Sequence, residues 1–188
     1  MGGMRHIRSR GTTQGVLLAV LLGAIPSALG GQQSAPTNPV ADEATAAHRK
    51  AYDLLAEASM DDWPQVATLL EQAAAARPAG DGTALYERTA AAQLFYMTGA
   101  LARAETNLLT AARAAISADQ IFQGAQLLVQ AAFVAEKRGE MGEAIDYAHG
   151  AEWLARSPRL TPEQSDRIRS SIHWLPAGAA EPGRSTQT

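Results

Sequence analysis

The sequence predicts an all-α fold built from paired helices. Alanine is the most abundant residue, with 40 copies in a chain of 188 residues. The 19 leucines outnumber the 13 valines and isoleucines together, and aromatic residues make up only 5% of the chain. Small side chains let helices approach one another closely, whereas sheets favour β-branched and aromatic residues. The composition therefore favours close helix-on-helix packing and excludes an all-β protein.

The first 30 residues have the three-part pattern of a secretory signal peptide. Arginines precede an apolar run from Val16 to Ile25, and Pro26 with a group of small residues follows it. Because a bilayer span needs roughly 20 apolar residues and this run is about half as long, we expect cleavage rather than permanent anchoring. Ala28 and Gly30 are small residues at signal-peptidase spacing, so we expect cleavage after Gly30. The alternatives are a retained anchor and a cytosolic protein with a buried N-terminal helix.

The charge of the chain argues against a nucleic-acid partner. The formal net charge is −3, and removal of residues 1–30 takes away three arginines and no acids, which makes it −6. Proteins that bind nucleic acids normally carry a clustered basic face. The sequence also holds no cysteine, which excludes disulfide scaffolds, thiolate metal sites and cysteine nucleophiles. Residues 31–41, rich in proline and polar side chains, are predicted to be a flexible linker.

Helix start and stop signals divide the rest of the chain. Pro64 falls in a predicted first turn, the segment 78–82 is typical of a loop, and the segments 117–120 and 161–164 are predicted capping boxes. Between these signals, apolar residues recur at helical spacing. The predicted helices cover residues 42–59, 63–77, 84–98, 101–116, 120–138 and 141–156, which form three pairs.

The three helix pairs share an internal repeat. In the third pair a turn glycine, Gly139, precedes a helix with small residues at its contact positions, beginning with Ala144. Small residues at these positions let two antiparallel helices approach closely. The repeat positions are Ala92, Gly99, Ala104, Ala111, Ala132, Gly139, Ala144, Ala151 and, at the end of the first pair, Pro78. This pattern resembles the tetratricopeptide repeat (TPR) family, in its exported bacterial type.

The resemblance implies a right-handed α-α superhelix, or solenoid, of about three TPR-like helical hairpins over residues 42–158. The hairpins would cover about 42–78, 83–116 and 119–158. The first pair departs from the family pattern, because Asp61 replaces the turn glycine. Successive turns are also 38 and 40 residues apart, against about 34 residues in the family. The alternative is a generic alanine-rich helical bundle.

A single amphipathic helix is predicted to close the array. Within residues 159–175, Ile168, Ile172 and Leu175 form one apolar stripe opposite charged residues. Repeat arrays need such a helix, because their last repeat would otherwise expose its apolar face. Residues 176–188, rich in small and polar residues, are predicted to be a disordered tail.

The sequence offers no candidate catalytic site, metal site or cofactor. It contains no nucleotide-binding loop, no nucleophile elbow and no zinc-protease motif, and its histidines are dispersed. Glu140, Glu143 and Asp146 lie close enough for a paired-acid site, but a solvated helix face is the favoured interpretation.

The family resemblance implies a binding groove on the first helix of each pair. There, polar and aromatic side chains hold peptides in TPR proteins. The corresponding residues are Tyr52, Tyr86, Gln93, Tyr96, Gln126, Gln130, Phe133 and Lys137, with His48 and Leu55 beside them. The alternative is that Tyr86, Tyr96 and Phe133 belong to the core. The clamp that some TPR proteins use for a terminal carboxylate is missing.

Together these observations predict a non-enzymatic, exported scaffold, periplasmic or extracellular, that binds a protein or peptide partner in a concave groove. No nucleic-acid partner and no permanent membrane span are expected. One alternative is a self-associating structural protein that stacks through an alanine-rich edge at residues 73–76. A further alternative is a small envelope enzyme or glycan-binding accessory that uses the acids between Glu140 and Asp146.

Overall fold

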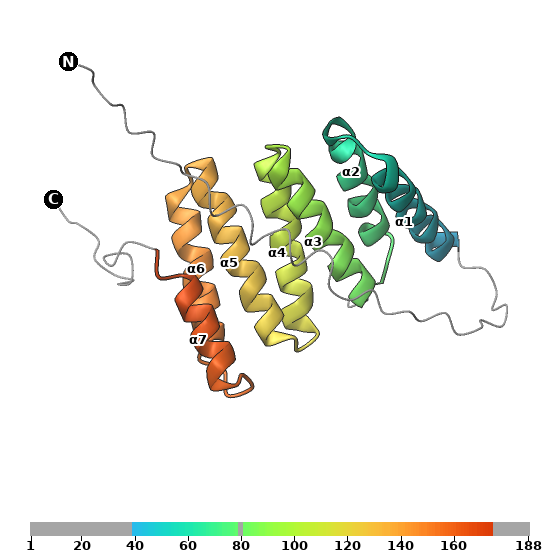
Figure 1. Ribbon diagram of the computed structural model, residues 1–188. Coiled ribbons are helices and arrows are strands. Elements are labelled where there is room, and N and C mark those ends of the chain that lie inside the picture. The colour runs from blue at the N-terminus through green and yellow to red at the C-terminus, as the bar shows by residue number, and fades with distance from the viewer. Residues whose placement is uncertain (1–38, 79–80, 175–188) are drawn as a thin grey trace, which may run out of the picture. The chain divides into compact units, whose positions relative to one another are not determined.

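The computed structural model of the chain describes residues 39–78 and 81–174, and all regular structure within them is helical. Along the chain the elements are α1 (Pro39–Glu57), a short 3-10 helix η2 (Met60–Asp62), α2 (Trp63–Ala75), α3 (Gly82–Met97), α4 (Leu101–Ser117), α5 (Ile121–Arg138), α6 (Met141–Leu154) and α7 (Pro162–Ser171) (Figure 1). The predicted signal peptide, most of the predicted linker and the predicted tail lie outside the described residues.

Most helix boundaries lie within a few residues of the expected ones. The prediction that α2 has proline in its first turn is confirmed by Pro64. The capping box at the start of α7 is also confirmed, with Thr161 accepting from the backbone N–H of Gln164. Helix α1 begins at Pro39, inside the segment expected to be linker. A proline fits in a first turn because an N–H there would have no partner within the helix.

The turns that follow α3, α4 and α5 share one construction. One or two residues after each helix end the backbone is left-handed, with φ of 79° at Gly99, 63° at Asp119 and 86° at Gly139. In each turn two backbone N–H groups donate back into the preceding helix. In the last turn, for example, the N–H of Glu140 donates to the carbonyl oxygen of Ala135 at 2.9 Å. This is the Schellman pattern, which glycine favours because it lacks a Cβ.

The predicted capping box at residues 117–120 is wrong. Ser117 is the last residue of α4, and Gln120 precedes α5 without a capping hydrogen bond from its side chain. Asp119 takes the left-handed position that glycine fills in the two neighbouring turns. An aspartate tolerates this conformation better than most residues, so the serine and the aspartate are used to end a helix rather than to begin one.

Each helix from α1 to α6 packs against its neighbours in the chain, and Figure 1 shows them side by side in chain order. The alanines of the predicted repeat positions lie at these contacts and are almost fully buried. Larger side chains such as Phe95, Val66 and Leu108 fill the space between them. Contact is close between α4 and α5, where a Cβ added to Gly124 would lie 2.6 Å from Cγ1 of Ile116.

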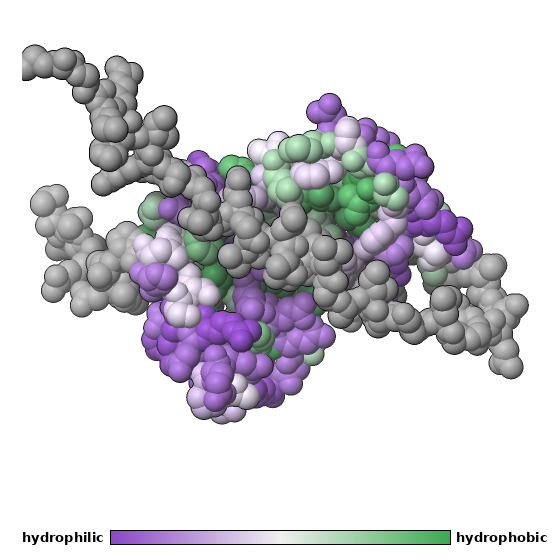
Figure 2. Space-filling model, viewed as in Figure 1, coloured by the Kyte–Doolittle hydropathy of each residue, from purple (hydrophilic) through white to green (hydrophobic). Residues whose placement is uncertain are grey.

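Helix α7 packs against α5 and α6. Its Ile168 is 1% exposed and belongs to a second buried cluster that includes Val129 of α5 and Leu154 of α6. The opposite face carries exposed charged residues, and Figure 2 shows a hydrophilic surface over α7. The helix therefore has the one-sided character expected of a cap.

Candidate functional site

The eight predicted groove residues all lie on α1, α3 and α5, the first helix of each pair. Tyr86 and Phe133 keep 44% and 40% of their surface exposed. Tyr52 and Tyr96 are half-buried and pack against the main core. Two of the four aromatic groove residues therefore face solvent, and the other two also pack against the core. Gln93, Gln126 and Gln130 are half-buried, and Lys137 is exposed.

His48 of α1 lies between the groove residue Tyr52 and a carboxylate of α3. The rings of His48 and Tyr52 lie 4.6 Å apart between centroids. The Nδ1 atom of His48 is 2.7 Å from Oε1 of Glu87, which connects α1 to α3. Burial and the neighbouring hydroxyl of Tyr86 raise the pKa of Tyr52 above its ordinary value. The phenol of Tyr52 is therefore neutral at physiological pH and can donate a hydrogen bond.

Glu87 is a buried carboxylate that sequence reasoning missed. Its side chain is fully buried, and it accepts hydrogen bonds from Nε of Arg77 at 2.8 Å and from Nη2 at 2.9 Å. The hydrogen bonds to Glu87 raise the pKa of Arg77. Bidentate bonding of this kind compensates for the removal of a carboxylate from water. In the sequence, Glu87 stands out only as the single acidic residue among apolar residues of α3. This pattern does not indicate which side chains bond to it.

A second buried carboxylate, Glu105, connects α4 to α5 and α6. It accepts from Nη1 of Arg138 and, at 2.9 Å, from the hydroxyl of Tyr147. Burial, followed by the hydrogen bond to Glu105, raises the pKa of Tyr147 to about 12. Interaction with the Glu105 carboxyl group, followed by burial, raises the pKa of Glu143. The three acids named as a possible enzyme site are all exposed, and only Glu143 is brought into this cluster.

A third carboxylate, Glu71, connects α2 to α4. Its Oε1 atom accepts from Nδ2 of Asn107 at 2.7 Å, and its Oε2 atom pairs with Arg103. The guanidinium of Arg103 also lies 4.0 Å from the centre of the Phe95 ring. Asn107 is 1% exposed, so this hydrogen bond is shielded from water. In all three clusters, a carboxylate bonds a side chain from a helix two positions away along the chain.

The α5 part of the predicted groove is covered by a residue that follows α7. The ring of Trp174 stacks on Phe133, with 4.8 Å between ring centroids and 28° between planes. Sequence reasoning assigned no role to Trp174. Another aromatic residue that it missed is Trp153 of α6, which is 72% exposed and lines a surface hollow with Ile121 and Pro158.

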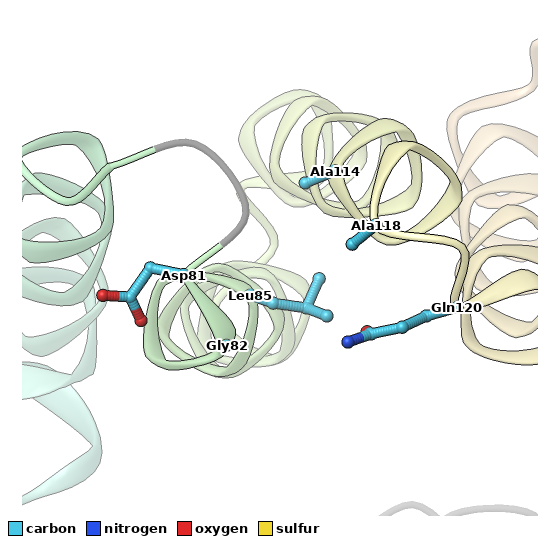
Figure 3. A pocket seen from close by; sticks show the side chains of 6 residues that line it. All are labelled: Asp81, Gly82, Leu85, Ala114, Ala118 and Gln120. Carbon is cyan, nitrogen blue, oxygen red and sulfur yellow. The ribbon is translucent and has the colours of Figure 1, made fainter.

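The hollow shown in Figure 3 is too small for a ligand. It lies between α3 and α4 and has a cavity volume of about 10 Å³. Leu85 and Gln120 point toward one another there, whereas the carboxylate of Asp81 points away. That space suits about one water molecule. Among the described residues, no group of His, Asp and Glu side chains is arranged to hold a metal ion.

Neither a protein-family model, nor a curated protein, nor a solved structure significantly matches the chain. Within residues 39–78 and 81–174, no helix is both long and apolar enough to cross a membrane. In the alanine-rich edge proposed for self-association, Ala73 and Ala74 are 0% and 3% exposed, whereas Ala75 is exposed and Ala76 is half-buried.

Proposed function

We propose that the chain is an exported, non-enzymatic TPR-like scaffold that binds a protein or peptide on the shared face of α1, α3 and α5. One observation carries the proposal. The first helices present exposed aromatic rings, Tyr86 and Phe133, next to half-buried glutamines. Aromatic rings beside amides suit an extended peptide, which offers both apolar side chains and backbone hydrogen bonds.

The pattern of cross-links between helices supports the solenoid part of the proposal. His48 bonds Glu87 between α1 and α3, and the Tyr147 hydroxyl bonds Glu105 between α4 and α6. In a stack of helical hairpins, first helices lie beside first helices and second helices beside second helices. Contacts between helices two apart in the chain are the ones that this arrangement requires.

Site-specific photo-cross-linking tests the binding face. A photoreactive phenylalanine derivative replaces Tyr86 or Phe133 in separate variants, and the matched control carries it at Trp153, which is more exposed but belongs to a second helix. Irradiation of an envelope extract should attach the same partner at both groove positions and not at position 153. A partner captured only at position 153 would place the binding surface on another face.

The intact mass of the protein recovered from cells tests export separately. Cleavage after Gly30 gives a mature chain that begins at Gly31. Full-length protein in washed membranes would contradict the proposed cleavage.

A further inference from the structure

Trp174 lies on the face of α5 that carries four of the predicted groove residues. Gln126, Gln130, Phe133 and Lys137 follow one another at intervals of four, three and four residues, so they share one side of the helix. The Trp174 ring stacks on Phe133, in the middle of this face. Because α7 ends at Ser171, a short stretch of chain is enough to bring the ring there.

The contact between the rings of Trp174 and Phe133 has features expected of a contact that a ligand can replace. Phe133 remains 40% exposed beneath it, and neither ring belongs to the two buried apolar clusters. The indole Nε1 of Trp174 is shielded from solvent, yet it has no hydrogen-bond partner among the described residues. A shielded N–H without an acceptor destabilises the state that contains it. The contact is therefore less favourable than one in which a ligand supplies both a ring and an acceptor.

We propose that Trp174 occupies, within its own chain, the position on α5 that an aromatic side chain of a bound peptide takes. This inference rests on the proposed function and adds a ligand class to it, namely an extended peptide that carries an aromatic residue. Phe133 supplies the stacking surface for the ring. Gln130 and Lys137, about one turn to either side, offer polar groups to the peptide backbone.

The position of Trp174 in the same chain makes it a strong competitor. A tethered group acts at a high effective concentration, so an external ring of similar chemistry binds weakly while Trp174 is in place. Removal of the Trp174 side chain should therefore open the site to a peptide added from solution. The same removal should have little effect on the fold, because the ring lies outside the buried clusters.

The experiment compares the full chain with its Trp174→Ala variant. The probe is a blocked synthetic peptide with the sequence of residues 170–178, and binding is read by saturation-transfer NMR on the peptide's indole protons. With about 1 mM peptide, close to the effective concentrations of short tethers, we expect roughly tenfold more transfer from Trp174→Ala than from the wild type. A second variant that combines Trp174→Ala with Phe133→Ala should lose this gain.

Matched controls separate stacking from general surface effects. Trp153→Ala removes a more exposed tryptophan from another helix and should behave like the wild type. Trp174→Phe keeps an aromatic ring on Phe133 and should also keep the site closed. For a peptide with alanine in place of tryptophan, transfer is read on the imidazole protons of its histidine, and none should appear with any variant. Circular dichroism melts verify that each variant is folded, and Trp174→Leu replaces Trp174→Ala if the alanine variant melts early.

Equal transfer from the wild type and Trp174→Ala would overturn the inference, as would a gain that survives the loss of Phe133. Either result leaves the cross-linking test of the proposed function intact, because that test uses an external partner and not this peptide. Conversely, cross-links confined to position 153 would contradict the proposed function, while the peptide result would still report whether Trp174 covers a site for an aromatic ring.

Discussion

The carboxylate of Glu87 is fully buried, and Arg77 satisfies it with two hydrogen bonds of 2.8 and 2.9 Å. Arg77 follows the end of α2, whereas Glu87 belongs to α3, so the pair closes the connection between the first two helix pairs. His48 of α1 adds a third bond to the same carboxylate. Three parts of the chain thus depend on one acidic side chain.

Replacement of Glu87 tests whether these three parts of the chain depend on its carboxylate. Glu87→Gln keeps the volume but leaves the guanidinium of Arg77 without its anionic partner. Breaking a buried ion pair costs about 3 to 5 kcal/mol, and we expect the lower end because Arg77 keeps some contact with solvent. Urea denaturation measures the change in the free energy of unfolding. Glu57→Gln, an exposed substitution in α1, is the control, and equal effects of the two variants would mean that the pair does not hold the helices together.

The alanine contacts between helices give a second prediction. Ala104 and Ala144 are both 0% exposed, so a leucine at either position must force neighbouring helices apart. We expect Ala104→Leu and Ala144→Leu each to lower the free energy of unfolding by about 1 to 3 kcal/mol. Ala102→Leu places the same side chain on the exposed side of α4 and should change stability little. Thermal melts in which all three variants behave alike would argue against close packing at these alanines.

The sequence was sufficient to predict features that have a local cause. Proline in the first turn of α2, the capping box at Thr161 and the turn at Gly139 each follow from the chemistry of neighbouring residues. The error at Ser117 has a local cause as well, because serine and aspartate can either begin a helix or end one. The alanine-rich helix α4 extends through Ser117, and Asp119 ends it in the left-handed conformation.

Features that depend on distant residues could not be predicted. Glu87 meets His48 across 39 positions, and the residues near Glu87 in the sequence do not indicate which partners its carboxylate has. The contact of Trp174 with Phe133 depends in the same way on how α7 packs against α5. Helical periodicity placed Tyr52 and Tyr96 on the first helices, but only the packing shows that both also contact the main core.

Gly139 and Gly142 provide a third prediction, because alanine should destabilise the protein at the first position and stabilise it at the second. Gly139 has φ of 86° and nothing within 4 Å of an added Cβ, so Gly139→Ala is penalised by backbone conformation alone. We expect a loss of about 1 to 2 kcal/mol. Gly142 has the same open surroundings but lies inside α6, where Gly142→Ala should add about 0.4 to 1 kcal/mol. Stabilisation by both substitutions would show that the turn at Gly139 is not left-handed.

The carboxyl groups of Glu105 and Glu143 predict a dependence of stability on pH. The pKa of Glu143 is raised from its ordinary value of 4.5, because interaction with Glu105 outweighs the attraction of Arg138. A raised pKa means that the folded chain favours protonated Glu143. This stabilisation is complete when the pH is below the ordinary pKa of a glutamate. It is lost as the pH rises through the pKa that Glu143 has in the folded chain. Glu143→Gln should therefore melt above the wild type at neutral pH, and the difference should shrink as the pH falls below the ordinary value of 4.5. Asp146→Asn, an exposed acid in the same helix, is the control for general charge effects.

Tyr86 and Tyr96 distinguish a binding role from a structural one on the same helix. Tyr86 is 44% exposed, whereas Tyr96 is half-buried against the main core. Tyr96→Ala should lower the melting temperature, because truncation of a core aromatic residue costs up to about 3 to 5 kcal/mol. Tyr86→Ala should leave the melting temperature nearly unchanged but weaken binding of the partner identified by cross-linking. Binding and thermal stability must be measured on the same preparations, because a variant that unfolds also loses binding. If Tyr86→Ala keeps full affinity while folded, then its ring does not contact the ligand, and the binding face must be sought among the side chains of α5.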